Sequence, residues 1–135
     1  MKMKPCLGLE EARRIVSGAA AHAQAQGWNV TICVCDDGGH LLALERADGA
    51  APFTVRVAIG KGTVAALGRR ESKVFEDTIN QGRTAFVTVP LDGMLEGGVP
   101  ITVDGHVIGS VGVSGVKSSQ DAEIARAGIA ALQSA

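Results

Sequence analysis

The stretch VCDDGGHLLALERADGA, residues 34–50, gives the clearest structural signal in the chain. An apolar run enters a turn at Asp37-Gly38 and leaves it as a second apolar run, a pattern typical of a β-hairpin. The second run ends in Arg46 and Asp48, followed directly by glycine. The stretch therefore predicts two antiparallel strands, with a charged loop where the second strand ends.

Helical periodicity flanks this hairpin on both sides. Apolar residues recur every three or four positions over residues 9–23 and stop before a glycine, which predicts an amphipathic helix. A second helix is predicted over residues 53–67, with Pro52 at its entry. Gly60 and Gly62 each weaken a helix by about 1 kcal/mol relative to alanine. Close approach of a neighbouring backbone or of a ligand is the usual reason for such glycines.

The second half of the chain is predicted to form a sheet followed by a helix. A short helix is expected around residues 73–79, then a short strand AFVTV at 85–89. A second hairpin is expected over residues 99–115 around an Asp-Gly turn. The spacing from Ser118 to Asp121 matches a capping box that opens a closing helix. Helices separated by antiparallel hairpins indicate an α+β fold with five strands, as a single domain over the whole chain.

Composition narrows the range of functions. The chain has 135 residues, 13 basic and 14 acidic side chains, a net charge of -1, 3% aromatic residues and no tyrosine. Such a chain lacks the basic patch and stacking platforms of nucleic-acid-binding proteins, so no nucleic-acid partner is expected. The N-terminus lacks the apolar run of a signal peptide, and no run approaches the length of a membrane span. We therefore expect a cytoplasmic protein without a membrane partner.

Cysteine and apolar content add two expectations. Three cysteines are an odd number and do not indicate a disulfide framework. Cys33 and Cys35 fall on one face of the first predicted strand, as small half-buried side chains rather than as zinc ligands. Hydrophobic residues make up 46% of this small domain, which predicts buried contacts between subunits, although much of that content is alanine.

Three residues near the hairpin and the second helix are candidates for ligand binding. Arg46 offers a planar fork to a carboxylate, with Asp48 to orient it, although Arg-x-Asp at a strand end also occurs in solvated turns. Lys61 lies among apolar residues between two glycines. It supplies either a charge to a pocket or a side chain that reaches out to water.

A second group of candidates lies in the stretch EGGVP, residues 96–100. Successive glycines, here Gly97 and Gly98, allow backbone N–H groups to form an anion-binding nest. Glu96 beside them is a candidate general base or an ordinary loop charge. His40 opens the second strand and is the other candidate proton carrier, while the three histidines are not spaced as a metal cluster, so no metal site is expected.

Four motifs together resemble the GlcG/HbpS family, often labelled the haem-degrading domain, which includes the C-terminal part of PduO-type proteins. They are the hairpin stretch at 34–50, AIGKGTVAAL, GGVPITVDGHVIGSVGVSG and SSQDAEIARAGIAAL. The resemblance covers about residues 8–133. It implies a profilin/PAS-like sandwich with a five-stranded antiparallel sheet and flanking helices, assembled as dimers to octamers. It also implies haem as a cofactor, or an accessory role in a catabolic pathway, with a pocket near Arg46, Asp48, Lys61 and the segment Gly97 to Pro100.

The chain departs from the family pattern at two places. Ala47 stands where the family commonly has methionine, and Gly62-Thr63 follow the lysine where alanine and an aromatic residue are common. Both changes remove apolar bulk, which favours a small carboxylated ligand over a porphyrin. Two functions stay open: a protein that binds haem or a small organic acid near a subunit interface, and a cofactor-free hydrolase or isomerase using Glu96 or His40.

Overall fold

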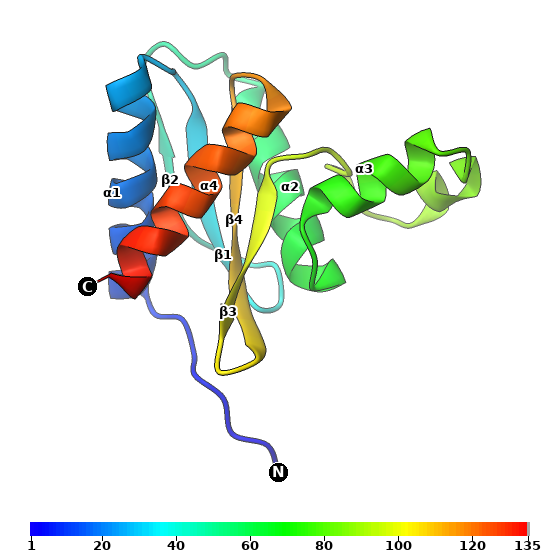
Figure 1. Ribbon diagram of the computed structural model, residues 1–135, viewed down its shortest axis with the longest axis horizontal. Coiled ribbons are helices and arrows are strands. Elements are labelled where there is room, and N and C mark those ends of the chain that lie inside the picture. Colours follow the sequence, from blue (N-terminus) through cyan, green and yellow to red (C-terminus); the bar gives the residue numbers. More distant parts are fainter. Residues whose placement is uncertain (135) are drawn as a thin grey trace.

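Helices cover both faces of one antiparallel sheet (Figure 1). The computed structural model describes residues 1–134. Its elements in chain order are α1 (Leu9–Gln26), β1 (Thr31–Asp36), β2 (Leu41–Arg46), α2 (Thr54–Gly68), α3 (Ser72–Asn80), the 3₁₀ turn η1 (Thr84–Thr88), β3 (Gly98–Val103), β4 (His106–Ser114) and α4 (Ser118–Gln133). The strand order is β2-β1-β4-β3, and α1 packs along α4 on one face while α2 packs on the other.

The α+β class and both predicted hairpins are confirmed, but the count of five strands is wrong. Four strands form the sheet within residues 1–134. The predicted strand at 85–89 is instead η1, because no sheet edge lies beside it to complete its hydrogen bonds. Phe86 of η1 stacks on Phe75 of α3, with 5.6 Å between ring centroids, so this segment packs on a helix.

Alternation along the central strand β1 supplies both layers of the core. Ile32 and Val34 face α1 and α4 in the main apolar cluster. Cys33 and Cys35 face α2, where the Cys33 thiol donates to the carbonyl of Ala58 at 3.3 Å. All three cysteines are free thiols.

The glycines of α2 are explained by close packing against neighbouring segments. A Cβ on Gly60 would lie 3.1 Å from the carbonyl oxygen of Asp92, in the segment that leads into β3. A Cβ on Gly62 would lie 3.2 Å from one of the sulfurs of β1. Opposite it, a Cβ on Gly112 of β4 would come within 2.0 Å of the Ala58 carbonyl oxygen. Glycine on both sides therefore lets α2 lie directly on the sheet.

No helix within residues 1–134 is long and apolar enough to cross a lipid bilayer.

Candidate functional site

One end of the sheet gathers several of the predicted site residues. In the ladder, Arg46 at the end of β2 pairs with Thr31 at the start of β1, which pairs with Ser114 at the end of β4. The lip formed by Glu96, Gly97 and Gly98 enters β3 beside the same end of β4. Three strand spacings separate β2 from β3, roughly 14 Å at ~4.8 Å each. The two halves of the predicted site thus share an end of the sheet without touching.

Arg46 faces the side of the sheet on which α2 packs. Its cross-strand partner Thr31 faces α2, because the Thr31 hydroxyl lies 2.8 Å from the hydroxyl of Thr54. Directly paired residues share a face of the sheet, so Arg46 points to the α2 side as well. The first turn of α2 also carries Arg56, and both arginines are exposed. Within residues 1–134 neither arginine forms an ion pair, and neither does Asp48.

A groove of about 460 Å³ adjoins Arg56. Its lining combines one cation, one carboxylate and five apolar or small residues of α2 and of the segment before β3: Arg56, Ile59, Gly60, Thr63, Pro90, Leu91 and Asp92. The volume lies in the range of about 300–1,000 Å³ that is usual for small-molecule sites. A cavity between α1 and β1 holds only about 60 Å³, too little for an organic ligand of that kind. The groove on α2 is therefore a better candidate than this cavity, although two grooves beside α1 have similar volumes of about 500 and 560 Å³.

Lys61 is buried rather than open to a pocket. Its ammonium donates to the carbonyl of Val113 at 3.0 Å and to the carboxylate of Asp121 at 3.1 Å. Both members of the ion pair are 2% exposed. The other oxygen of Asp121 accepts the N–H of Val116 at 3.1 Å. Burial raises the pKa of Asp121, and the charge of Lys61 opposes that rise.

This ion pair corrects the predicted capping box at residues 118–121. Ser118 is the first helical residue of α4, and the backbone N–H of Lys117 donates to the side chain of Gln120 at 3.3 Å. Asp121 instead turns inward to Lys61. The pair joins α2 to the N-terminus of α4, where the helix dipole also favours a carboxylate.

The glycine lip packs directly on Lys61. A Cβ on Gly97 would come within 2.8 Å of the Lys61 ammonium, and the φ angle of Gly97 is 134°. The N–H of Gly98 donates to the Ser72 hydroxyl at 2.8 Å, and the N–H of Glu96 donates to Glu76 at 2.8 Å. Side chains of α3 therefore accept hydrogen bonds from two N–H groups of the lip, and Lys61 packs against the buried side of the lip.

Two predicted residues lie away from this end of the sheet. His40 precedes β2 at the opposite end, about 20 Å from Arg46 at ~3.4 Å per residue. Its ring is 3.2 Å from the carboxylate of Asp36. Because Glu96 and His40 lie at opposite ends, one subunit does not bring both to one substrate. Pro100 lies on the edge strand β3 and lines a separate groove beside α4 with Arg126.

Sequence reasoning missed two functional candidates. Arg56 is the one exposed charge on α2, visible in the sequence as an arginine four residues before Gly60. Asp121 was interpreted only as a local cap, since its partner lies far away in the sequence. No local pattern reports a contact of that kind.

The comparisons with known proteins agree with this architecture. The model of a family described as "Haem degrading protein HbpS-like" matches residues 7–130. The chain belongs to this family. Protein GlcG of Escherichia coli K12 is 53% identical over 114 residues, covering 84% of this chain and 85% of GlcG. The resemblance to the GlcG/HbpS family is thereby confirmed.

Solved structures show the same fold. A double mutant of Streptomyces reticuli HbpS superposes with a TM-score of 0.85 at 29% identity, covering 96% of this chain and 89% of the other. A PduOC–haem complex superposes with a TM-score of 0.82 at 23% identity, covering 94% of this chain and 95% of the other. At that identity the second likeness concerns the fold alone.

The residues of the groove fit the porphyrin ring and the propionates of a haem group better than its iron. Arg56 suits a propionate, and Ile59, Pro90 and Leu91 give the ring an apolar wall, with Asp92 as the one acidic residue of the lining. The lining contains no histidine, cysteine, methionine or tyrosine, the usual axial ligands of haem iron. His40 follows Gly39, whose carbonyl lies 3.5 Å from the Thr63 hydroxyl on the groove wall. The hairpin turn thus contacts the C-terminal half of α2, while the His40 ring itself lies 3.2 Å from Asp36.

Proposed function

We propose that this chain binds a carboxylated ligand, either haem or a small organic acid, as an accessory protein of a catabolic pathway. The observation that carries the proposal is the presence of two unpaired, exposed arginines on the α2 side of the sheet: Arg56 lines a largely apolar groove, and Arg46 ends β2. Membership of the HbpS-like family supports a haem-related ligand. Asp48 stands beside Arg46 in the loop and would orient its guanidinium.

The remaining predicted residues take supporting positions in this proposal. Lys61 holds the lip of Glu96, Gly97 and Gly98 from behind instead of contacting the ligand. The lip is roughly 14 Å from Arg46 by strand spacing, so it meets the same ligand only if the ligand spans the sheet end or comes from another subunit. In this proposal the ligand lies at or near a subunit interface, where the lip of another subunit meets it.

The test is a titration with hemin followed in the Soret region. Arg46→Ala and Arg56→Ala should each raise the Kd about 10- to 100-fold, since a hydrogen bond to a charged group contributes about 1.5–3 kcal/mol. Arg14→Ala, an exposed arginine on α1 that also forms no ion pair, is the matched control and should bind like the wild type.

Protoporphyrin IX separates the roles of iron and carboxylates. If the arginines dominate, the iron-free ring binds with an affinity close to that of hemin, and His40→Ala has little effect. If His40 ligates iron, hemin binds more tightly than protoporphyrin IX, and His40→Ala abolishes the difference. Phthalate, measured by calorimetry, probes the small-acid alternative. The proposal would be refuted if none of the three probes bound. It would also be refuted if both arginine variants bound all three probes as tightly as the wild type.

A further inference from the structure

The groove on α2 carries one positive and one negative side chain. Its cation is Arg56 of α2, and its carboxylate is Asp92, in the segment that leads into β3. Both residues are exposed, and within residues 1–134 neither forms an ion pair, with the other or with any further side chain. A guanidinium and a carboxylate that share a groove without pairing are both free to bind a ligand.

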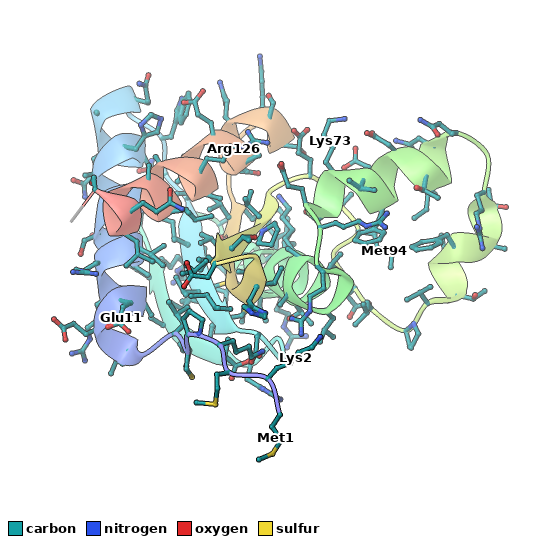
Figure 2. All side chains as sticks on the ribbon, turned by 60° about the horizontal axis from the view of Figure 1, so that its bottom comes forward. Met1, Lys2, Glu11, Lys73, Met94 and Arg126 are labelled. Carbon is teal, nitrogen blue, oxygen red and sulfur yellow. The ribbon has the colours of Figure 1, made fainter. Side chains whose placement is uncertain are left out.

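Close backbone packing fixes the position of Asp92. Figure 1 shows this segment returning from η1 to β3, and Figure 2 labels Met94 on it. A Cβ on Gly60 would lie 3.1 Å from the carbonyl oxygen of Asp92, and a Cβ on Gly93 would collide with the backbone of Gly60. The φ angle of Gly93 is 89°, in the region that favours glycine. The segment therefore crosses α2 in backbone contact at Gly60 and holds Asp92 against the helix.

The two charged groups lie about one helical turn apart. Arg56 precedes Gly60 by four residues, and residues at this spacing are neighbours on a helix surface, with about 5–6 Å between their Cβ positions. Asp92 lies over Gly60, so its carboxylate is positioned one turn beyond Arg56. An α-amino acid joins its ammonium and its carboxylate through a single carbon. With a hydrogen bond of about 2.9 Å at each end, such a molecule bridges groups separated by roughly one turn.

The charge of the groove distinguishes between classes of acid. One cation and one carboxylate give the lining no net charge. A plain carboxylate that pairs with Arg56 brings a second negative charge close to Asp92, and like charges repel. A zwitterion instead places its ammonium at Asp92 and its carboxylate at Arg56, so that each charge has a partner. Ile59, Pro90 and Leu91 provide an apolar wall for the rest of the molecule.

We propose that the groove binds a free α-amino acid with an apolar side chain, and that Asp92 determines this specificity. The inference rests on the proposed function, because Arg56 binds the carboxylate of the ligand in both. It narrows the ligand from carboxylated molecules in general to those that carry an ammonium group next to the carboxylate.

The experiment compares two ligands that differ in a single group. L-Leucine and 4-methylpentanoate share one carbon skeleton, and only leucine carries the α-ammonium. In titrations of the whole chain followed by NMR at neutral pH, the Kd for leucine should be about 5-fold lower than the Kd for 4-methylpentanoate. Asp92→Asn should abolish this preference by weakening the binding of leucine alone. Asp104→Asn removes the same charge from the exposed turn between β3 and β4, so it is the matched control and should keep the wild-type preference.

Four results would overturn the inference. They are equal affinity of the wild type for the two ligands, a preference that survives Asp92→Asn, a preference that is also lost in Asp104→Asn, and an absence of leucine binding. Circular dichroism confirms that each variant is folded.

Arg56→Ala separates this inference from the proposed function. It should weaken the binding of both leucine and 4-methylpentanoate, and leucine binding that is unchanged in this variant would also overturn the inference. Binding of hemin or phthalate that depends on Arg56, without any preference for leucine, would remove the role of Asp92 and leave the proposed function standing.

Discussion

At the scale of single residues, Lys61 shows that a lysine among apolar residues can form a buried ion pair instead of contacting a ligand. A lysine among apolar residues predicts either a charge in a pocket or a side chain that reaches water, and Lys61 lies against the glycine lip. Its charge, however, is satisfied by Asp121 and Val113. The partner could not be foreseen because it comes from another helix far along the chain. Arg46, whose position depends only on where β2 ends, is exposed at the end of that strand as expected.

Removing Lys61 should destabilise the fold strongly. Lys61→Met leaves the buried Asp121 without its cation, which should lower the free energy of unfolding by about 3–5 kcal/mol at neutral pH. The double variant Lys61→Met/Asp121→Asn should recover much of that loss, because no uncompensated charge remains. Urea unfolding of the three proteins at equal concentration measures both effects.

The loss should depend on pH in a defined direction. The pKa of Asp121 is raised in the folded state, so the folded protein holds this proton more tightly and the stability from this group falls as pH rises through the raised value. Without Lys61 the pKa rises further. The effect of Lys61→Met should therefore shrink when the pH is lowered from about 7.5 to about 5. An equal loss at both pH values would contradict this account of the pair.

At the scale of elements, the sequence pattern correctly predicted those helices and hairpins that depend on interactions between nearby residues. The helices at residues 9–23 and 53–67 and the two Asp-Gly hairpins are present because periodicity and turn chemistry act over a few residues. The segment at 85–89 has the composition of a strand, but strand formation requires a neighbouring edge, and its position beside α3 provides an aromatic stack instead. The neighbour that each glycine of α2 contacts likewise depends on the tertiary structure.

The contact of α2 with the sheet yields a test at this scale. Gly112→Ala would place a methyl group about 2 Å from the Ala58 oxygen, so α2 must move away and the free energy of unfolding should fall by about 1–3 kcal/mol or more. Gly27→Ala, where a Cβ would meet nothing within 4 Å, should lose only the cost of a left-handed residue, about 1–2 kcal/mol. Thermal unfolding would contradict the packing account if Gly27→Ala were the more damaging change.

At the scale of the whole molecule, the chain divides into a packed body and an arm, residues 73–96. The body has an apolar cluster on each face of the sheet, whereas the arm buries no side chain. Amides of α3 and η1 should therefore exchange with solvent deuterium well before those of β1 and β4. Uniform exchange across body and arm would contradict this division.

The cysteines beneath α2 provide an internal probe of how often this helix separates from the sheet. Cys33 and Cys35 are fully buried beneath α2; their mutual interaction, together with burial, raises the pKa of the Cys33 thiol, and the same interaction lowers the pKa of Cys35. A thiol that alkylating reagents cannot reach is inert towards them whatever its pKa. Cys6 is exposed and would be modified at once. The slower second phase of modification would then time how often α2 lifts from the sheet, with no label added to the protein.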